Sequence, residues 1–135
     1  ERRCEWACCT KMSEYKRDHP RIKQSLQVEI ITSEGKALFA DTCDVSKRGV
    51  QLLCDSITVR DIFGGPPVAL PTKPPAVTLK LTLKSPDKEP RQIEADCKAV
   101  FSRRVSEQEY RVGLLIHSLP RPSRIELDAY VDEYL

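Results

Sequence analysis

Apolar and polar residues alternate over several stretches of this chain, and that alternation constrains the fold more than any other feature. In residues 77–83 every second residue is Val or Leu, and the residues between them are Thr or Lys. This is the pattern of a strand with one buried face. Six such stretches, separated by turn residues, predict a mainly β chain folded as a six-stranded antiparallel barrel. The predicted strands are Leu26–Ile30, Lys36–Val45, Val50–Leu53, Val77–Leu83, Ile93–Phe101 and Tyr110–Ile116.

Two further segments complete the predicted fold. Ser123, with Glu126 three residues later, predicts an N-cap and a capping box for an amphipathic C-terminal α-helix over about 123–135. We expect this helix to plug or flank the sheet, with a dimer contact as the alternative. Residues 55–76 contain two adjacent glycines and five prolines, which predicts an irregular connection in which a few apolar residues pack locally.

The length of 135 residues fits one domain with a short extension. We expect a domain over 16–135, with the barrel at about 25–118, preceded by an N-terminal arm or linker at 1–15. Because the chain starts at Glu1 without methionine, we expect it to be part of a longer protein or to lack its leading residues, and an upstream domain can precede the arm. No apolar run is long enough to insert into a membrane. The net charge of +2 is too small to produce the positive field that would attract a nucleic-acid polymer.

The six cysteines do not follow a disulfide or metal framework. Some lie in strand-like stretches, and a core of this size needs no cross-links, so we expect reduced thiols in the cytoplasm. A metal or redox module built on Cys4, Cys8 and Cys9 is the alternative, although zinc sites usually have four ligands at tighter spacing. We therefore expect no metal and no cofactor.

Two arginines precede the first predicted strand at a spacing of four. Pro20 disfavours a helical conformation at the residue before it, so Arg17 and Arg21 belong to a loop or an extended basic arm over 16–24, which follows residues 1–15. Side chains four residues apart in an extended segment point to the same side. Guanidinium groups suit phosphate oxygens and the O6/N7 edge of guanine. The arm is therefore a candidate contact for an anionic guanine nucleotide.

The turn after the second predicted strand carries the complementary groups. Asp44 can accept hydrogen bonds from N1–H and N2–H of guanine, and Ser46 adds a small donor and acceptor. Gly49 permits a positive φ and a close approach of the backbone to a ligand. The alternative is an ordinary turn in which Asp44 and Ser46 satisfy local backbone N–H groups.

These residues resemble a known pair of motifs. Arg-x-x-x-Arg at 17–21 is followed after 22 residues by Asp-x-Ser-x-x-Gly at 44–49, which resembles the paired motif of PilZ domains, bacterial receptors for cyclic di-GMP. Residues Tyr110–Ile116 are similar to the last strand of that family. The resemblance covers about 16–135 and implies a PilZ-type six-stranded barrel with a helix at one end.

The resemblance also implies a function. It describes a cytoplasmic receptor or effector that binds cyclic di-GMP and changes the geometry of its arm or of a partner, in pathways such as motility or biofilm control. Lys16 stands where the family biases between one ligand and a stacked pair, and its charge favours the pair. The ligand contacts that the resemblance assigns are Arg17, Arg21, Asp44, Ser46 and Gly49.

Several alternatives stay open. A PilZ-like domain can bind a protein partner instead of nucleotide, and a small barrel can bind single-stranded nucleic acid if aromatic residues line its strands. No nucleophile and base motif is recognisable, so an enzyme is not expected. Besides the nucleotide, an upstream domain or a protein is the expected partner, and the chain is expected to be a monomer or a ligand-linked dimer.

Overall fold

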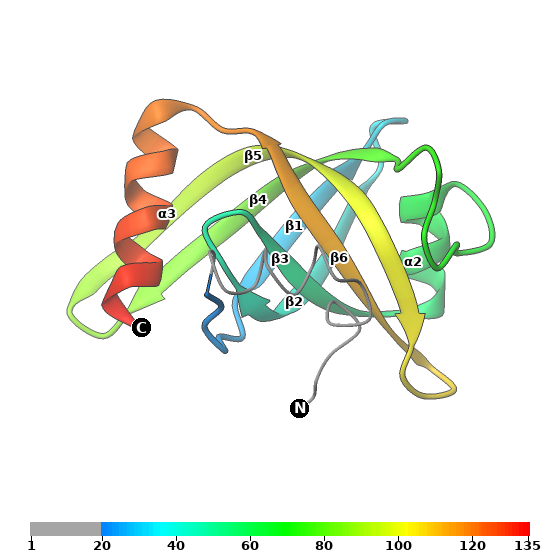
Figure 1. Cartoon of the computed structure of the whole chain (residues 1–135), viewed down its shortest axis with the longest axis horizontal. Coiled ribbons are helices and arrows are strands. Elements are labelled where there is room, and N and C mark those ends of the chain that lie inside the picture. The colour runs from blue at the N-terminus through cyan, green and yellow to red at the C-terminus, as the bar shows by residue number, and fades with distance from the viewer. Residues whose placement is uncertain (1–19) are drawn as a thin grey trace.

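A computed structural model describes residues 20–135 and confirms the predicted barrel (Figure 1). The sheet closes on itself in the strand order β1-β2-β3-β6-β5-β4, and every neighbouring pair is antiparallel. Across 20–135, no helix is long and apolar enough to cross a membrane. The strands are β1 Gln27–Thr32, β2 Ala37–Val45, β3 Gly49–Asp55, β4 Ala76–Ser85, β5 Lys88–Arg104 and β6 Glu109–Ser118.

The alternation of apolar and polar residues in the sequence matches the alternation of buried and exposed side chains in the barrel. Along β4, Val77, Leu79, Leu81 and Leu83 are each at most 4 % exposed, and the residues between them face outward. The inward rows of all six strands meet in one core, because successive side chains of a strand point to opposite faces. The polar residues left on the outer surface are therefore the ones available to form a site.

Helix α2, Ser56–Phe63, corrects the expectation that 55–76 is irregular throughout. Asp55 is its N-cap, with the carboxylate accepting a 2.7 Å hydrogen bond from the backbone N–H of Thr58. Gly64 ends the helix in the left-handed conformation, with φ of 68°. The buried Val59 and Ile62 hold α2 against one end of the barrel, opposite the end that carries the C-terminal helix (Figure 1).

Helix α3, Arg121–Glu133, is the predicted C-terminal helix, but it starts two residues early and lacks the predicted capping box. Its N-cap position is Pro120, which makes no side-chain hydrogen bond. Glu126 instead forms a 2.6 Å ion pair with Arg91 on β5. A strand that supplies a guanidinium offers the carboxylate a charged partner, which outweighs a local cap.

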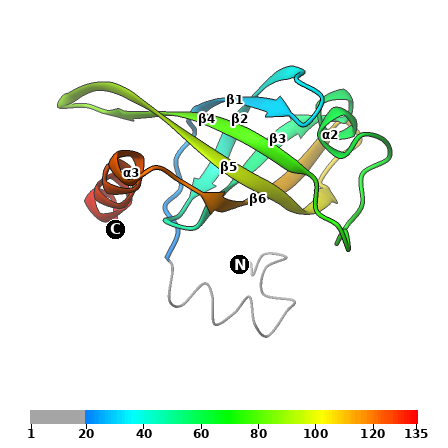
Figure 2. The same ribbon diagram turned by 90° about the horizontal axis from the view of Figure 1, so that it is seen from above.

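Helix α3 lies against the extended β4–β5 hairpin (Figure 2). Leu127, Tyr130 and Val131 are fully buried there, and the Tyr130 hydroxyl donates to the carbonyl of Lys84 over 3.0 Å. The helix thus flanks the sheet, which was the first of the two roles expected for it. Self-association through α3 stays a prediction.

Candidate functional site

The segment before β1 is fixed to β2 in the described part of the chain. Ile22 and Val45 exchange two backbone hydrogen bonds of 2.8 and 2.9 Å, and Ile22 is buried. Further along, the Thr42 hydroxyl accepts from the backbone N–H of Leu26 and donates to the carbonyl of Gln24. From Arg21 onward the segment before β1 is therefore docked on the barrel. Lys16 and Arg17 lie outside the described residues.

Docking of this segment brings Arg21 to Asp44. The guanidinium Nη1 of Arg21 donates to Oδ1 of Asp44 over 2.7 Å, and the two side chains are 10 % and 15 % exposed. Water therefore screens this pair less than a surface ion pair, and each charge stabilises its partner. Two residues that the sequence analysis singled out separately form one charged site.

A bulge in β2 determines the direction of Asp44. The register between β2 and β3 shifts between Thr42 and Asp44, so that Asp44 pairs with Gln51. The extra residue, Cys43, changes the phase of the alternation, and bulges of this kind re-aim a side chain. Asp44 therefore lies on the outer face beside Gln51, while Val45 next to it stays buried in the core.

Ser46 braces the turn between β2 and β3. It is fully buried, and its hydroxyl oxygen lies 3.2 Å from the backbone N–H groups of Arg48 and Gly49. The same hydroxyl lies 3.2 Å from the carbonyl oxygen of Gly49. The turn-bracing alternative is therefore right for Ser46, and a direct ligand contact by this residue stays a prediction.

Gly49 is required by packing, which corrects the expectation of a positive φ. Its φ is not positive. A Cβ at this position would lie 2.1 Å from the backbone carbonyl oxygen of Leu114 on β6. Because that neighbour is backbone and cannot rotate away, only glycine lets β3 begin this close to β6. A ligand contact through the Gly49 backbone stays a prediction.

Sequence reasoning missed two polar residues on the same outer face. Gln51 is fully buried although its place in β3 turns it outward, and its Oε1 accepts a 3.3 Å hydrogen bond from Nη1 of Arg111 on β6. Arg111 stands directly opposite Arg103 of β5. The lone Gln in the apolar run Val-Gln-Leu-Leu, and an arginine two residues before Gly113, are the signals that mark them in the sequence.

A second bulge completes this face. The β5–β6 register shifts between Ala99 and Phe101, so that Phe101 stands opposite Gly113. A Cβ on Gly113 would lie 2.2 Å from the Phe101 ring, so the glycine makes room for the aromatic side chain. A glycine inside a strand often marks a bulge or a close backbone approach. The bulge is on the partner strand, and the approaching group is a side chain.

Helix α3 contacts the turn between β2 and β3. Nζ of Lys47 lies 2.8 Å from Oδ1 of Asp132, and this hydrogen bond raises the pKa of Lys47. Arg124 donates to the carbonyl of Lys47 and pairs with Asp128 over 2.9 Å. The turn that carries Ser46 and Gly49 is thus connected to the C-terminal helix, and a shift in one changes the contacts of the other.

The described cysteines are free thiols. Burial raises the pKa of Cys54 and of Cys97 to about 12, so both stay protonated near neutral pH and are poor nucleophiles or metal ligands. No group of three metal-binding side chains occurs in 20–135. The metal or redox candidates Cys4, Cys8 and Cys9 lie outside the described residues.

Comparison with known proteins matches the family described as PilZ domain over residues 15–133. The structure is similar to the inhibitor of motility MotI/DgrA of Bacillus subtilis, with a TM-score of 0.65 and 14 % identity, covering 87 % of this chain and 50 % of that one. The chain thus spans about half the length of that protein. No curated protein matches in sequence.

Two structures solved with nucleotide are also similar. The PilZ domain with c-di-GMP of YcgR from Escherichia coli gives a TM-score of 0.58 and 10 % identity over 88 % of this chain and 91 % of that one. PlzA of Borreliella burgdorferi in complex with c-di-GMP gives 0.54 and 15 % over 91 % and 55 %. At these identities the likeness establishes the fold.

Proposed function

The chain belongs to the PilZ domain family, and from that premise we propose that it is a non-enzymatic receptor for cyclic di-GMP in the bacterial cytoplasm. The observation that carries the proposal is the 2.7 Å pair between Arg21 and Asp44. It joins the second arginine of the first motif to the acid that opens the second. The residues of both motifs that the structure describes therefore lie at one edge of the barrel.

The chemistry of the pair suits the ligand. Cyclic di-GMP presents two anionic phosphates and guanine edges that carry both donors and acceptors. A guanidinium can bind a phosphate or the guanine O6/N7 edge, and a carboxylate can accept from guanine N1–H and N2–H. We assign these roles to Arg21 and Asp44, with Arg17 and Lys16 adding phosphate contacts from the arm.

Ser46 and Gly49 act mainly through the backbone in this proposal. The Ser46 hydroxyl fixes the turn, and Gly49 seats it against β6. A fixed turn presents its groups to the ligand without an ordering cost. All of the motif residues therefore have a role in the proposed function. Of the described ones, Arg21 and Asp44 contact the ligand, and Ser46 and Gly49 shape the turn.

Nucleotide binding affects the rest of the protein through the two segments that meet at the site, the arm and the turn between β2 and β3. Since the arm is already docked from Arg21 onward, a change in arm geometry belongs to the residues before Pro20, where the ligand would join them to the barrel edge. The contacts of Lys47 with α3 give a second route, from the turn to the C-terminal helix. Either route can reposition an upstream domain or a protein partner.

Calorimetric titration of the folded chain with cyclic di-GMP tests the proposal, with GTP and linear pGpG as controls. We expect saturable binding of cyclic di-GMP at a ratio of one or two ligands per chain, and much weaker binding of both controls. Circular dichroism establishes that the protein is folded. Folded protein that binds no cyclic di-GMP would contradict the proposal and favour a protein-interaction domain.

A further inference from the structure

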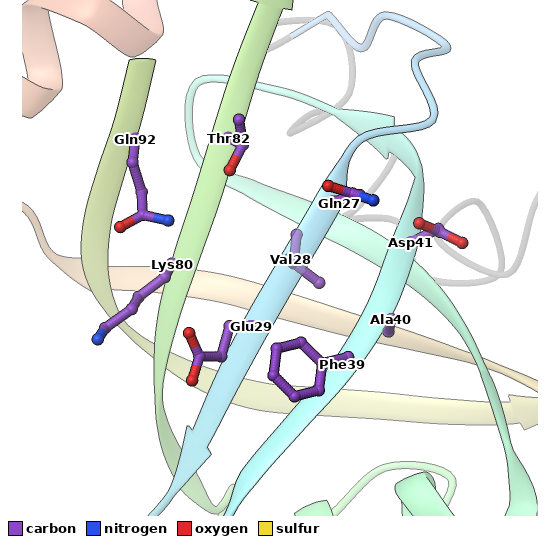
Figure 3. Close-up of a pocket in the computed structure, with 9 residues that line it drawn as sticks. All are labelled: Gln27, Val28, Glu29, Phe39, Ala40, Asp41, Lys80, Thr82 and Gln92. Atoms are coloured by element: carbon purple, nitrogen blue, oxygen red, sulfur yellow. The ribbon is translucent and has the colours of Figure 1, made fainter. Parts of the chain in front are cut away.

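An aromatic side chain stands on the outside of the barrel, away from the Arg21–Asp44 pair. Phe39, in the middle of β2, is 71 % exposed. It pairs with Glu29 across the β1–β2 ladder, and Figure 3 shows its ring beside the Glu29 side chain. Most of the large apolar side chains on the neighbouring strands β1 and β3 are buried in the core. The ring of Phe39 stays in water instead, so the protein does not gain the free energy of burying it.

Two hollows lie on either side of Phe39 and share it as a common wall. One has a volume of about 510 Å³ and includes Glu29, Asp41 and Lys80 in its lining (Figure 3). The other, of about 400 Å³, includes Asp41, Asp55 and Glu109. Phe39 and Asp41 therefore form a ridge that a partner chain can cross with side chains in both hollows.

The lining of these hollows is acidic although the whole chain has a net charge of +2. It contains four carboxylates, Glu29, Asp41, Asp55 and Glu109, against the single ammonium of Lys80. Lys80 itself stands opposite Glu29 on β1 and Glu94 on β5. The hydrogen bond from Thr58 lowers the pKa of Asp55, which keeps that carboxylate charged near neutral pH.

We propose that this face, centred on Phe39, is a docking surface for a basic segment of a partner protein. An arginine or lysine side chain can lie over the ring of Phe39, where the negative π face attracts its charge, while Glu29 and Asp41 contact it from the sides. Complementary charge then fixes the register and speeds association. The same carboxylates repel a nucleic acid, so a polyanion does not suit this face.

The proposal does not depend on nucleotide binding. Phe39 and Asp41 precede the β2 bulge, and Asp44 follows it. The two hollows together are lined by residues of all six strands, of α2 and of the turn before β6, and include neither Arg21 nor Asp44. A single strand thus carries the docking ridge in its middle and the nucleotide-binding acid near its end.

The test is a titration of the ¹⁵N-labelled full chain with the peptide acetyl-Arg-Thr-Arg-Thr-Arg-amide, followed by amide chemical shifts. We expect saturable shifts centred on Phe39, Glu29 and Asp41. Phe39→Ala should raise the Kd about 2- to 5-fold, the range that an exposed cation–π contact represents. Asp41→Asn should also raise the Kd, because it removes a carboxylate that attracts the basic peptide. Added salt should weaken the binding of the peptide. Because both side chains are exposed, both variants are expected to fold.

Two matched controls make the test decisive. Leu70→Ala removes another exposed apolar side chain, which is 78 % exposed and does not line either hollow, and should leave the Kd unchanged. The peptide acetyl-Glu-Thr-Glu-Thr-Glu-amide should not bind. Shifts spread over other faces, an unchanged Kd in Phe39→Ala, or burial of Phe39 by a second copy of the chain would each overturn the proposal.

Discussion

Arg21 and Asp44 stand 23 positions apart in the sequence and meet in a 2.7 Å hydrogen bond. Their side chains are 10 % and 15 % exposed, so the pair is a charge-assisted bond shielded from most of the solvent. Arg21 is placed by the backbone bridge between Ile22 and Val45, and Asp44 is placed by the bulge in β2. One contact thus depends on two separate features of the fold, which makes it a sensitive point for mutation.

The first prediction concerns the stability of this pair. Arg21→Ala and Asp44→Ala should each lower the free energy of unfolding by about 1.5–3 kcal/mol, because each leaves a partly desolvated charge without its partner. The double variant should be less destabilised than the sum of the two, with a coupling of at least ~0.5 kcal/mol. Urea denaturation of all four proteins measures this, and strict additivity would show that the pair contributes nothing.

The second prediction concerns Gly49. Overpacking a core usually costs ~1–3 kcal/mol. Gly49→Ala should lower the free energy of unfolding by more than this range, because the Cβ of the alanine would meet the backbone oxygen of Leu114. Gly113→Ala provides the comparison, since the atoms it would meet belong to the side chain of Phe101. Replacing Phe101 by Leu should therefore rescue Gly113→Ala but not Gly49→Ala. Thermal denaturation gives the ranking, and a Gly49→Ala protein as stable as wild type would refute the packing argument.

The third prediction concerns the N-cap of α2. Asp55→Ala should cost about 1 kcal/mol near neutral pH, whereas Asp55→Asn keeps the cap and should cost less. The hydrogen bond from Thr58 lowers the pKa of Asp55 below its usual 3.8. The stabilisation by the charged form is therefore complete above that value and is lost as the pH falls through the lower, folded-state pKa.

Urea denaturation at pH 7 and pH 3 checks the Asp55 prediction. Wild type and Asp55→Asn should differ more at pH 7 than at pH 3, because asparagine does not titrate. A stability difference that is independent of pH would mean that the Asp55 charge plays no part in capping α2.

The sequence predicted the six strands because each keeps one face in the core. It did not predict α2, since Ile57, Thr58 and Val59 are β-branched residues with a weak helix preference and prolines follow soon after. Their helical form depends on burial of Val59 and Ile62 against the barrel end. Tertiary packing therefore determines that this segment is helical, and such packing cannot be predicted from the local pattern of residues.

The arrangement of the candidate site could be predicted only in part, for a similar reason. Spacing identified Arg21, Asp44, Ser46 and Gly49, which the structure brings to one edge of the barrel. The buried hydroxyl of Ser46 and the clash at Gly49 depend on contacts with the turn and with β6, and no local pattern contains them. Arg111 was missed because its neighbour Gln51 comes from a strand 60 positions away.

The fourth prediction concerns Arg111. Its side chain bonds to Gln51, which pairs with Asp44 across the β2–β3 ladder, so Arg111 lies near the proposed ligand. Arg111→Ala should weaken cyclic di-GMP binding by at least about 10-fold, the lower end of the effect of losing one charge-assisted hydrogen bond. Calorimetry measures the loss, and Arg111→Lys should recover little, because an ammonium lacks the planar fork. Unchanged affinity in folded Arg111→Ala would remove this residue from the site.

The measurement that tests the central claim most directly is the affinity of Arg21→Ala for cyclic di-GMP. The matched control is Arg104→Ala, because that guanidinium bonds to the carbonyls of Ser106 and Glu107 in the β5–β6 turn. With both variants shown to be folded, Arg21→Ala should bind roughly 10- to 150-fold more weakly than wild type, and Arg104→Ala should bind like wild type. Equal affinity in all three proteins would contradict the assignment of the nucleotide site to Arg21 and Asp44.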